Sequence, residues 1–186
     1  ASGEGQQLDV EFETRNDVTE DEYIEMIRLK TSVLLACACK VGAIMADAPA
    51  DDTYNLYKFG EKLGLAFQLQ DDLLDVYGDP VVFGKNIGGD ITSNKKTYML
   101  INAFNRATPA QREELTKWVE AKEFDRNEKV AAVTSLYNEI GIRELCEMKI
   151  EQYYQESLVY LAKVNIPEER KAELKAYAAD MMKRQS

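Results

Sequence analysis

Apolar residues recur at helical spacing along most of the chain, in long segments separated by short polar turns. Strand-like alternation of apolar and polar residues is nearly absent and only four prolines interrupt the segments, so the pattern predicts an all-α protein. The 186 residues are enough to bury one core, and we expect a single domain over residues 1–186. Helices are expected over residues 3–13, 19–46, 53–77, 97–106, 109–118, 125–139, 142–164 and 167–184.

The segment 53–77 is the most informative of these helices. Its residues Gln68, Asp71, Asp72 and Asp75 all fall within about 100° of the helix circumference. Apolar residues occupy most of the remaining circumference, namely Leu63, Leu65, Phe67, Leu69, Leu73, Leu74, Val76 and Tyr77. We therefore expect this helix to be largely buried and its three carboxylates to face a cavity.

These three carboxylates need a compensating partner. Like charges four residues apart destabilise a helix slightly, and burial of unpaired carboxylates costs far more. Because the chain has no histidine, an oxygen-binding divalent ion such as Mg²⁺, held by carboxylates, water and substrate phosphates, fits this pattern. Two alternatives stay open at this point: the aspartates are solvated surface groups, or they pair with nearby lysines.

Basic residues flank the acidic segment in the sequence. Lys30 and Thr31 interrupt an apolar run, and Lys30 there is either a lysine that reaches solvent or a phosphate ligand. Lys85 lies in a glycine-rich loop, and Lys95 and Lys96 follow soon after it. Glycines allow the backbone to approach a ligand, and these lysines can pair with the acidic helix or bind phosphate.

Two further polar pairs have a structural interpretation. Asp51 and Asp52 superficially repeat the aspartate motif, but we assign them to the N-cap and first turn of the helix, where the helix dipole favours carboxylates. Gln6 and Asp9 share one helical face near the N-terminus. Their spacing alone favours an exposed polar edge over a polar site.

Composition narrows the possible partners and chemistry. The net charge of −10 argues against nucleic acid as a partner, because phosphate binding needs a basic face. The absence of histidine excludes serine or cysteine triads and histidine general bases. The cysteines Cys37, Cys39 and Cys146 have neither disulfide nor metal spacing, and we expect mostly buried thiols in a reducing compartment. No signal peptide or long apolar run is found, which predicts no membrane span and a cytoplasmic location.

Several motifs occur together in a fixed order along the chain. They are Gly5-Gln6-x-x-Asp9, Lys30-Thr31, Phe67-Gln68-Leu69-Gln70-Asp71-Asp72-Leu73-Leu74-Asp75, Gly84-Lys85, Gly89-Asp90-Ile91 and Asn94-Lys95. This ordered set resembles the trans-isoprenyl diphosphate synthases, and most closely their farnesyl diphosphate synthase branch. The resemblance implies an isoprenoid-synthase-type all-α bundle around a deep cavity, a homodimer, and the Mg²⁺-dependent condensation of an allylic diphosphate with isopentenyl diphosphate.

The same resemblance assigns residues to the leaving diphosphate. Asp71, with Asp72 and Asp75 acting through water, would bind one Mg²⁺ of a cluster. The residues in contact with the allylic diphosphate would be Lys30, Lys85 and Lys95. Departure of pyrophosphate from an allylic carbon separates charge, which Mg²⁺ and lysines would stabilise.

Further residues would surround the allylic cation. By resemblance, Gln68 and Thr31 would turn oxygen atoms toward it, and Phe67 would lie beside the isopentenyl substrate. The supporting polar groups of the cavity would be Gln6, Asp9 and Asp90. Apolar walls would exclude water, which would otherwise quench the cation to an alcohol.

The sequence departs from the family pattern in one respect: it contains only the second aspartate-rich motif. The first motif and the arginines that follow it would precede Gly5. We therefore expect a C-terminal portion of a synthase, a bundle incomplete at the N-terminus, little or no synthase activity in this chain alone, and no readable product length. Two alternatives remain open, a non-catalytic partner subunit of a prenyl synthase and a class I terpene cyclase.

Overall fold

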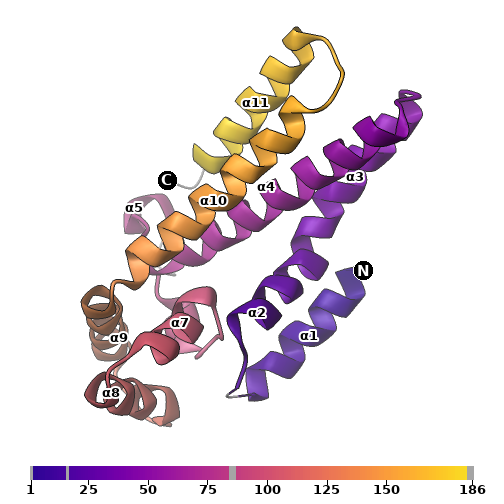
Figure 1. Ribbon diagram of the computed structural model, residues 1–186. Helices are drawn as coiled ribbons and strands as arrows, with labels where there is room; N and C mark the ends of the chain where they lie inside the picture. The colour runs from indigo at the N-terminus through magenta and orange to yellow at the C-terminus, as the bar shows by residue number, and fades with distance from the viewer. Residues whose placement is uncertain (1, 16, 84–86, 184–186) are drawn as a thin grey trace.

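The computed structural model describes residues 2–15, 17–83 and 87–183, which form helices and turns without a strand (Figure 1). The helices are α1 (Ser2–Thr14), α2 (Glu20–Ile27), the π-helix η1 (Arg28–Ser32), α3 (Val33–Met45), α4 (Ala50–Tyr77), α5 (Pro80–Phe83), α6 (Gly89–Thr92), α7 (Tyr98–Arg106), α8 (Pro109–Glu120), α9 (Arg126–Ile140), α10 (Ile142–Ala162) and α11 (Glu168–Lys183). The expected all-α fold is confirmed.

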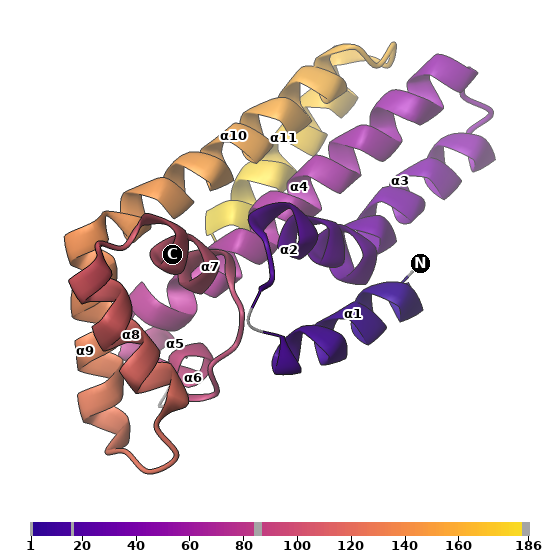
Figure 2. The same ribbon diagram turned by 60° about the horizontal axis from the view of Figure 1, so that its bottom comes forward.

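Helix α4 is the central element of the bundle. It runs antiparallel to α3, which precedes it, while α10 packs along its length and α11 turns back beside α10 (Figures 1 and 2). Helices α7, α8 and α9 gather around the C-terminal end of α4, and α1 packs against α2 and η1. The aspartates of α4 therefore lie where these two groups of helices meet.

The apolar residues of α4 form the middle of the main core. Leu65, Leu69, Leu73 and Val76 are buried and pack with residues of α2, α7, α9 and α10. A smaller core around Phe59 lies nearer the other end of α4, against α10 and α11. The prediction that this helix is largely buried is confirmed.

The start of α4 differs from the prediction. The helix begins at Ala50 with Pro49 as its N-cap residue, whereas Asp51 and Asp52 were expected to form the cap. Pro49 holds an extended backbone (ψ 154°) and has no N–H that would need a helical partner, so it ends the preceding turn and the helix starts at once. Both aspartates lie in the first turn, as expected from the helix dipole.

The segment predicted as one helix over residues 19–46 contains a π-helix. The segment begins with a capping box, in which Thr19 accepts the backbone N–H of Glu22 and the Glu22 side chain accepts that of Thr19. Residues 28–32 then widen into η1, where two other helices approach the backbone closely. A Cβ at Gly5 would overlap the backbone nitrogen of Lys30, and a Cβ at Gly64 would lie 2.8 Å from the Cα of Ser32. Both glycines thus allow α1 and α4 to contact η1.

The glycine-rich loop at 81–90 has helical ends where the structure describes it. Its described ends belong to the short helices α5 and α6, and residues 84–86 lie outside the described residues. Gly88 has a left-handed backbone (φ 88°) and donates its N–H to the carbonyl of Asp75 at 2.6 Å. This hydrogen bond ties the start of α6 to the end of α4.

The outer face of α3 is less buried than predicted. Cys37 is exposed and Cys39 half-buried, so the expectation of mostly buried thiols holds only for Cys146. Ile44, which was assigned to the apolar face, is 58% exposed. The reason is that α3 packs on α4 and η1, and none of the other described elements covers its opposite face to a comparable extent.

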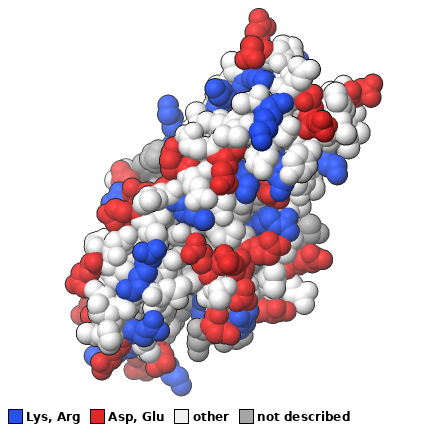
Figure 3. Space-filling model, in the orientation of Figure 1, with Lys and Arg blue, Asp and Glu red and all other residues white. Residues whose placement is uncertain are grey.

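Charged residues of both signs are interspersed on the surface. On the face shown in Figure 3, Lys and Arg side chains are scattered among Asp and Glu and form no continuous basic patch. A bilayer-spanning helix, which needs a long apolar segment, is not found among the helices of the described residues. The absence of nucleic-acid binding stays a prediction.

Candidate functional site

Asp72 lies at the centre of the site, buried between α4 and α2. Asp72 is 1% exposed. Its Oδ2 accepts a hydrogen bond from the Tyr23 hydroxyl, and its Oδ1 accepts one from Gln68 Nε2 at 3.4 Å. Burial raises the pKa of Asp72 to about 7, although Lys95 and the Tyr23 hydrogen bond act in the opposite direction. The protein alone therefore does not fully compensate this carboxylate.

Asp75 and Asp90 connect the end of α4 to α6. The backbone N–H of Asp90 donates to Asp75 Oδ2 at 2.9 Å. Burial raises the pKa of Asp75, and it raises that of Asp90 to about 6. Nearby carboxylates add to the shift of Asp90, while Lys95 opposes it. These two half-buried carboxylates thus share a region of excess negative charge.

Lys95 lies among the carboxylates that the sequence separates. It follows α6 and is half-buried. Burial alone would lower the pKa of its amine, but the attraction of Asp72, Asp90, Asp9 and Asp71 outweighs burial and leaves the pKa raised. Lys95 is therefore held as a cation where α1, α4 and α6 converge.

Lys30 reaches the same region from η1. Its Nζ forms an ion pair with Asp9 Oδ2 of α1 at 2.5 Å, and both side chains are partly exposed. The close approach of α1 at Gly5 places Asp9 next to the π-helix. The structure shows Lys30 paired with a carboxylate, which neither of the two alternatives for it named. Because this pair is partly exposed, an anionic ligand can still replace Asp9 as partner.

The three aspartates of α4 keep the predicted spread of about 100° around the helix, but their surroundings differ. Asp71 is exposed, Asp75 is half-buried, and Asp72 accepts a hydrogen bond from Tyr23 of α2. That all three face one cavity stays a prediction. Within the described residues, no group of three or more carboxylates or thiols is arranged to hold a metal ion.

The donor set nevertheless fits Mg²⁺. This ion is usually held by one or two carboxylates, water and substrate phosphates rather than by a cage of protein ligands. Five carboxylates lie near two described lysines here, and burial raises the pKa of three of them, so the protein alone does not favour their charged form. The residues that would supply its oxygen ligands are Asp71 and Asp75.

Other residues assigned by resemblance have different outcomes. Gln6 is exposed on α1, as its spacing alone indicated. Phe67 is half-buried on α4, beside Gln68 in the chain. Lys85 lies outside the described residues, and of Thr31 only the backbone is described, within η1. Their assigned roles stay predictions.

Sequence reasoning missed Tyr23 as part of the site, because its apolar neighbours assigned it to the core. Tyr23 is 1% exposed, and burial, followed by the nearby Asp72, raises the pKa of its hydroxyl well above the usual value. It lies seven residues before Lys30, two helical turns earlier. A buried tyrosine that needs a hydrogen-bond acceptor, on the same helix as a site lysine, is the signal that points to it.

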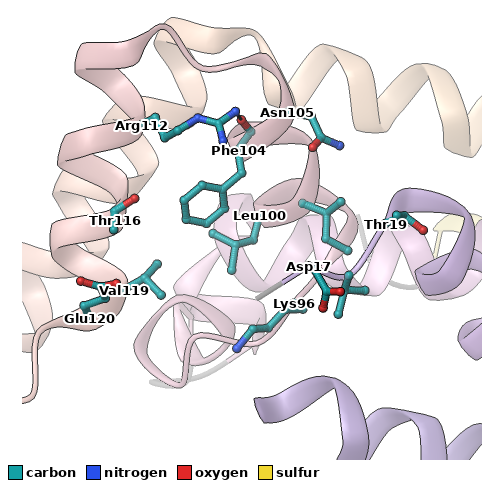
Figure 4. A pocket seen from close by; sticks show the side chains of 12 residues that line it. Asp17, Thr19, Lys96, Leu100, Phe104, Asn105, Arg112, Thr116, Val119 and Glu120 are labelled. Atoms are coloured by element: carbon teal, nitrogen blue, oxygen red, sulfur yellow. Dashed lines mark hydrogen bonds between the residues drawn. The ribbon is translucent and has the colours of Figure 1, made fainter. Parts of the chain in front are cut away.

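Lys96 and Lys95 point to different places although they are adjacent. Lys96 lines a pocket of about 380 Å³ between α7, α8 and the linker at 17–19, shown in Figure 4. Its walls are Asp17, Val18, Thr19, Lys96, Leu100, Ile101, Phe104, Asn105, Arg112, Thr116, Val119 and Glu120. The site aspartates of α4 are not among these residues, so this pocket is separate from the acidic end of α4.

The fold and the site define an α-helical protein in which Lys95 lies near the aspartates of the central helix and Lys30 pairs with Asp9 of α1. The family model for polyprenyl synthetase matches residues 1–139 of this chain. The chain belongs to the polyprenyl synthetase family, and the resemblance seen in the motifs is confirmed.

Known proteins of this family are similar over nearly the whole chain. A (2E,6E)-farnesyl diphosphate synthase of Mycobacterium tuberculosis is 33% identical and covers 98% of this chain. A crystal structure of a geranylgeranyl pyrophosphate synthase superposes over all of the chain with a TM-score of 0.92 and 39% identity. The structure of such a synthase from Corynebacterium glutamicum, complexed with isoprenyl diphosphate and magnesium, has a TM-score of 0.88 and 31% identity over 99% of the chain.

The chain spans about half the length of these relatives. It covers 51% of the Mycobacterium protein, 57% of the first structure and 52% of the Corynebacterium structure. Their names differ in product length, so the resemblance to the farnesyl branch stays a prediction at that level.

Proposed function

We propose that this chain forms the diphosphate-binding side of a prenyltransferase active site. The reaction is the condensation of an allylic diphosphate with isopentenyl diphosphate, with release of pyrophosphate. One observation carries the proposal: Lys95 is held as a cation among aspartates of α1, α4 and α6. These aspartates outnumber the nearby described lysines, so their negative charge exceeds the positive charge of the lysines. A divalent cation and a diphosphate together complement such a mixture of acidic and basic groups.

The chain's own residues have distinct tasks in this proposal. Asp71 and Asp75 hold Mg²⁺, which when bound stabilises the negative charge of the departing diphosphate. Lys30, Lys95 and Lys85 bind the diphosphate oxygens and stabilise the negative charge that the diphosphate gains as the bond between its ester oxygen and the allylic carbon breaks. The magnesium complex of the Corynebacterium relative supports the choice of metal.

Gln68 and the apolar wall of α4 act on the allylic cation. Because Gln68 Nε2 donates to Asp72, the amide is oriented and its oxygen points elsewhere. That oxygen and Thr31 face the developing positive charge, and Phe67 lies beside the isopentenyl group. Asp72 itself orients Gln68 and accepts a hydrogen bond from Tyr23, and its assignment to Mg²⁺ through water remains part of the proposal.

The assembly and location are also proposals. The homodimer is inferred from the family resemblance, and the cytoplasmic location from the sequence. Measurement of the molecular mass in solution tests the homodimer. We place the residues that set product length in the part of the family's sequence that this chain does not span.

The first experiment measures ligand binding by the chain itself. Calorimetric titration with inorganic pyrophosphate in the presence of Mg²⁺ is expected to show weak, saturable binding that disappears with EDTA. Lys95→Ala should weaken this binding by roughly 10- to 100-fold, whereas Lys96→Ala, at the adjacent position that lines a different pocket, should leave it unchanged. Equal losses in both variants would contradict the proposal.

The second experiment measures the reaction. A chimera in which this chain replaces the matching residues of the Corynebacterium enzyme should incorporate labelled isopentenyl diphosphate into a longer prenyl diphosphate when Mg²⁺ is present. The chain alone should show little or no turnover. Substantial pyrophosphate release by a preparation with the verified mass of 186 residues would contradict that expectation. A cyclic hydrocarbon from the chimera would instead identify a terpene cyclase.

A further inference from the structure

A lysine without an assigned role is buried behind the site. Lys129 of α9 is 0% exposed, its Nζ donates to Asn94 Oδ1 at 2.6 Å, and it lies 4.1 Å from the centre of the Phe124 ring. Among the described residues, no carboxylate forms an ion pair with it. Burial lowers the pKa of its amine. Lysine is rarely buried without a charged partner, since an apolar residue costs less to bury.

Asn94 is the residue that Lys129 holds. Its backbone is left-handed (φ 58°), a conformation that asparagine tolerates better than most residues. Its Nδ2 donates to the carbonyl of Val119 at 3.0 Å, and its Oδ1 accepts from Lys129. A carbonyl only accepts and a lysine only donates, so the Asn94 amide has one satisfied orientation. The side chain is therefore fixed from α8 on one side and from α9 on the other.

The next residue is Lys95, the cation of the site. Its backbone N–H donates to the carbonyl of Asp90 at 2.9 Å, and its own carbonyl accepts from Thr97 at 2.9 Å. Asp90, Asn94, Lys95 and Lys129 line one cavity of only about 10 Å³. Because this space holds at most one water molecule, movement of the turn is limited by direct packing.

We propose that Lys129 is a positioning residue that acts through Asn94 to hold the turn from which Lys95 reaches the diphosphate. The contact with the Phe124 ring keeps the buried amine in place without a carboxylate that would compete for Lys95. The part of this inference that concerns the diphosphate rests on the proposed function. The part that concerns the positioning of Lys95 by Lys129 through Asn94 does not depend on the proposed function.

The first test uses the chain without ligand. Lys129→Met, of similar length but apolar, should leave the melting temperature unchanged or raise it, because a well-packed apolar residue replaces a buried charge. It should nevertheless speed hydrogen exchange at the Lys95 amide at least threefold and increase acylation of the Lys95 amine by acetic anhydride, both read by mass spectrometry. Lys129→Gln, which keeps a donor, should restore part of the protection. Unchanged exchange and acylation in a folded Lys129→Met protein would overturn the inference.

A second variant covers the case in which Lys129→Met does not fold. Asn94→Gly keeps access to the left-handed backbone but removes the amide that Lys129 and Val119 hold. It should loosen Lys95 to the same extent as Lys129→Met. Phe124→Leu, which leaves the Lys129 to Asn94 hydrogen bond in place, is the matched control and should have a smaller effect.

The third test separates positioning from general stability. Binding of inorganic pyrophosphate with Mg²⁺ should weaken about five- to tenfold in Lys129→Met, and the same substitution should have no further effect in a Lys95→Ala background. Independent, additive losses in the double variant would overturn the inference. If the wild-type chain binds no pyrophosphate, the proposed function fails, and the exchange and acylation results still decide whether Lys129 positions Lys95.

Discussion

Helix α4 carries an aspartate pair near each end, and the two pairs have opposite surroundings. In both pairs the first residue is exposed, Asp51 and Asp71, and the second is buried, Asp52 at 6% and Asp72 at 1% exposure. Asp52 Oδ1 accepts the backbone N–H of Asn165 at 2.9 Å, which ties the α10–α11 turn to the start of α4. Asp72 accepts from side chains only.

Two different causes separate the pairs. Carboxylates in the first turn of α4 are stabilised by its N-terminal partial charge, so Asp51 and Asp52 need no further cation. Asp75, in the last turn, receives the opposite effect of the dipole, whereas Asp72 lies more than a turn from the end of α4 and burial is what disfavours its charge. The same dipeptide is thus structural at one end and belongs to a group of carboxylates that needs a cation at the other.

The largest expected effect separates the two exposed aspartates. In the chimera, Asp71→Ala should lower kcat by about 10²–10³-fold, the usual cost of losing a group that stabilises transition-state charge. Asp51→Ala is the matched control, since it removes the first aspartate of the other pair. It should leave kcat within about a factor of two of the value for the unsubstituted chimera. Similar losses from both substitutions would remove the distinction between the pairs.

The pH dependence of stability should identify the C-terminal pair in the metal-free chain. Burial raises the pKa of Asp72 to about 7 in the folded state, above its ordinary value of 3.8. Between these pH values the folded state binds more protons than the unfolded state. The stabilisation from this group is therefore fully present below about pH 4 and is lost as the pH rises through about 7.

Asp72→Asn measures this contribution. It keeps an acceptor for Tyr23 but cannot ionise, so its free energy of unfolding relative to wild type should rise by about 4 kcal/mol between pH 4 and pH 8. Urea denaturation in EDTA at several pH values gives the difference. A constant difference across this range would show that Asp72 titrates normally.

The sequence predicted the bundle well because most helices are specified locally. Thr19, Thr108 and Asp125 each accept a backbone N–H from the first turn of a helix, as their patterns indicated. The π-helix η1 was not predicted, since it depends on Gly5 and Gly64, which bring other helices against it. Local periodicity contains no information about such an approach.

The site was predicted in its residue types more than in its geometry. Asp72 is buried and accepts a hydrogen bond from Tyr23, and sequence reasoning could not foresee this contact across 49 residues. Lys95 was assigned to the diphosphate by resemblance, but its position depends on Asn94 and on the buried Lys129, both of which have polar side chains that composition alone assigns to the surface. Contacts between distant segments therefore account for what sequence reasoning missed.

A smaller effect tests the structural role of the N-terminal pair. Asp52→Ala leaves the backbone N–H of Asn165 without this acceptor and should lower the free energy of unfolding by about 1 kcal/mol. Hydrogen exchange at the Asn165 amide should increase, since that turn loses its tie to α4. Asp52→Asn, which keeps the acceptor oxygen, should recover most of the loss. Unchanged exchange at Asn165 in the alanine variant would contradict this role.

The smallest effect has opposite signs at the two ends of α4. Asp51→Asn removes a favourable charge from the first turn and should destabilise the metal-free chain by about 0.5 kcal/mol. Asp75→Asn removes an unfavourable charge from the last turn, where burial already raises the pKa of the carboxyl, and keeps an oxygen for the Asp90 N–H. It should stabilise the metal-free chain by about 0.5 kcal/mol. Thermal denaturation in EDTA at low salt measures both shifts, and shifts of the same sign would show that the helix dipole does not distinguish the two pairs.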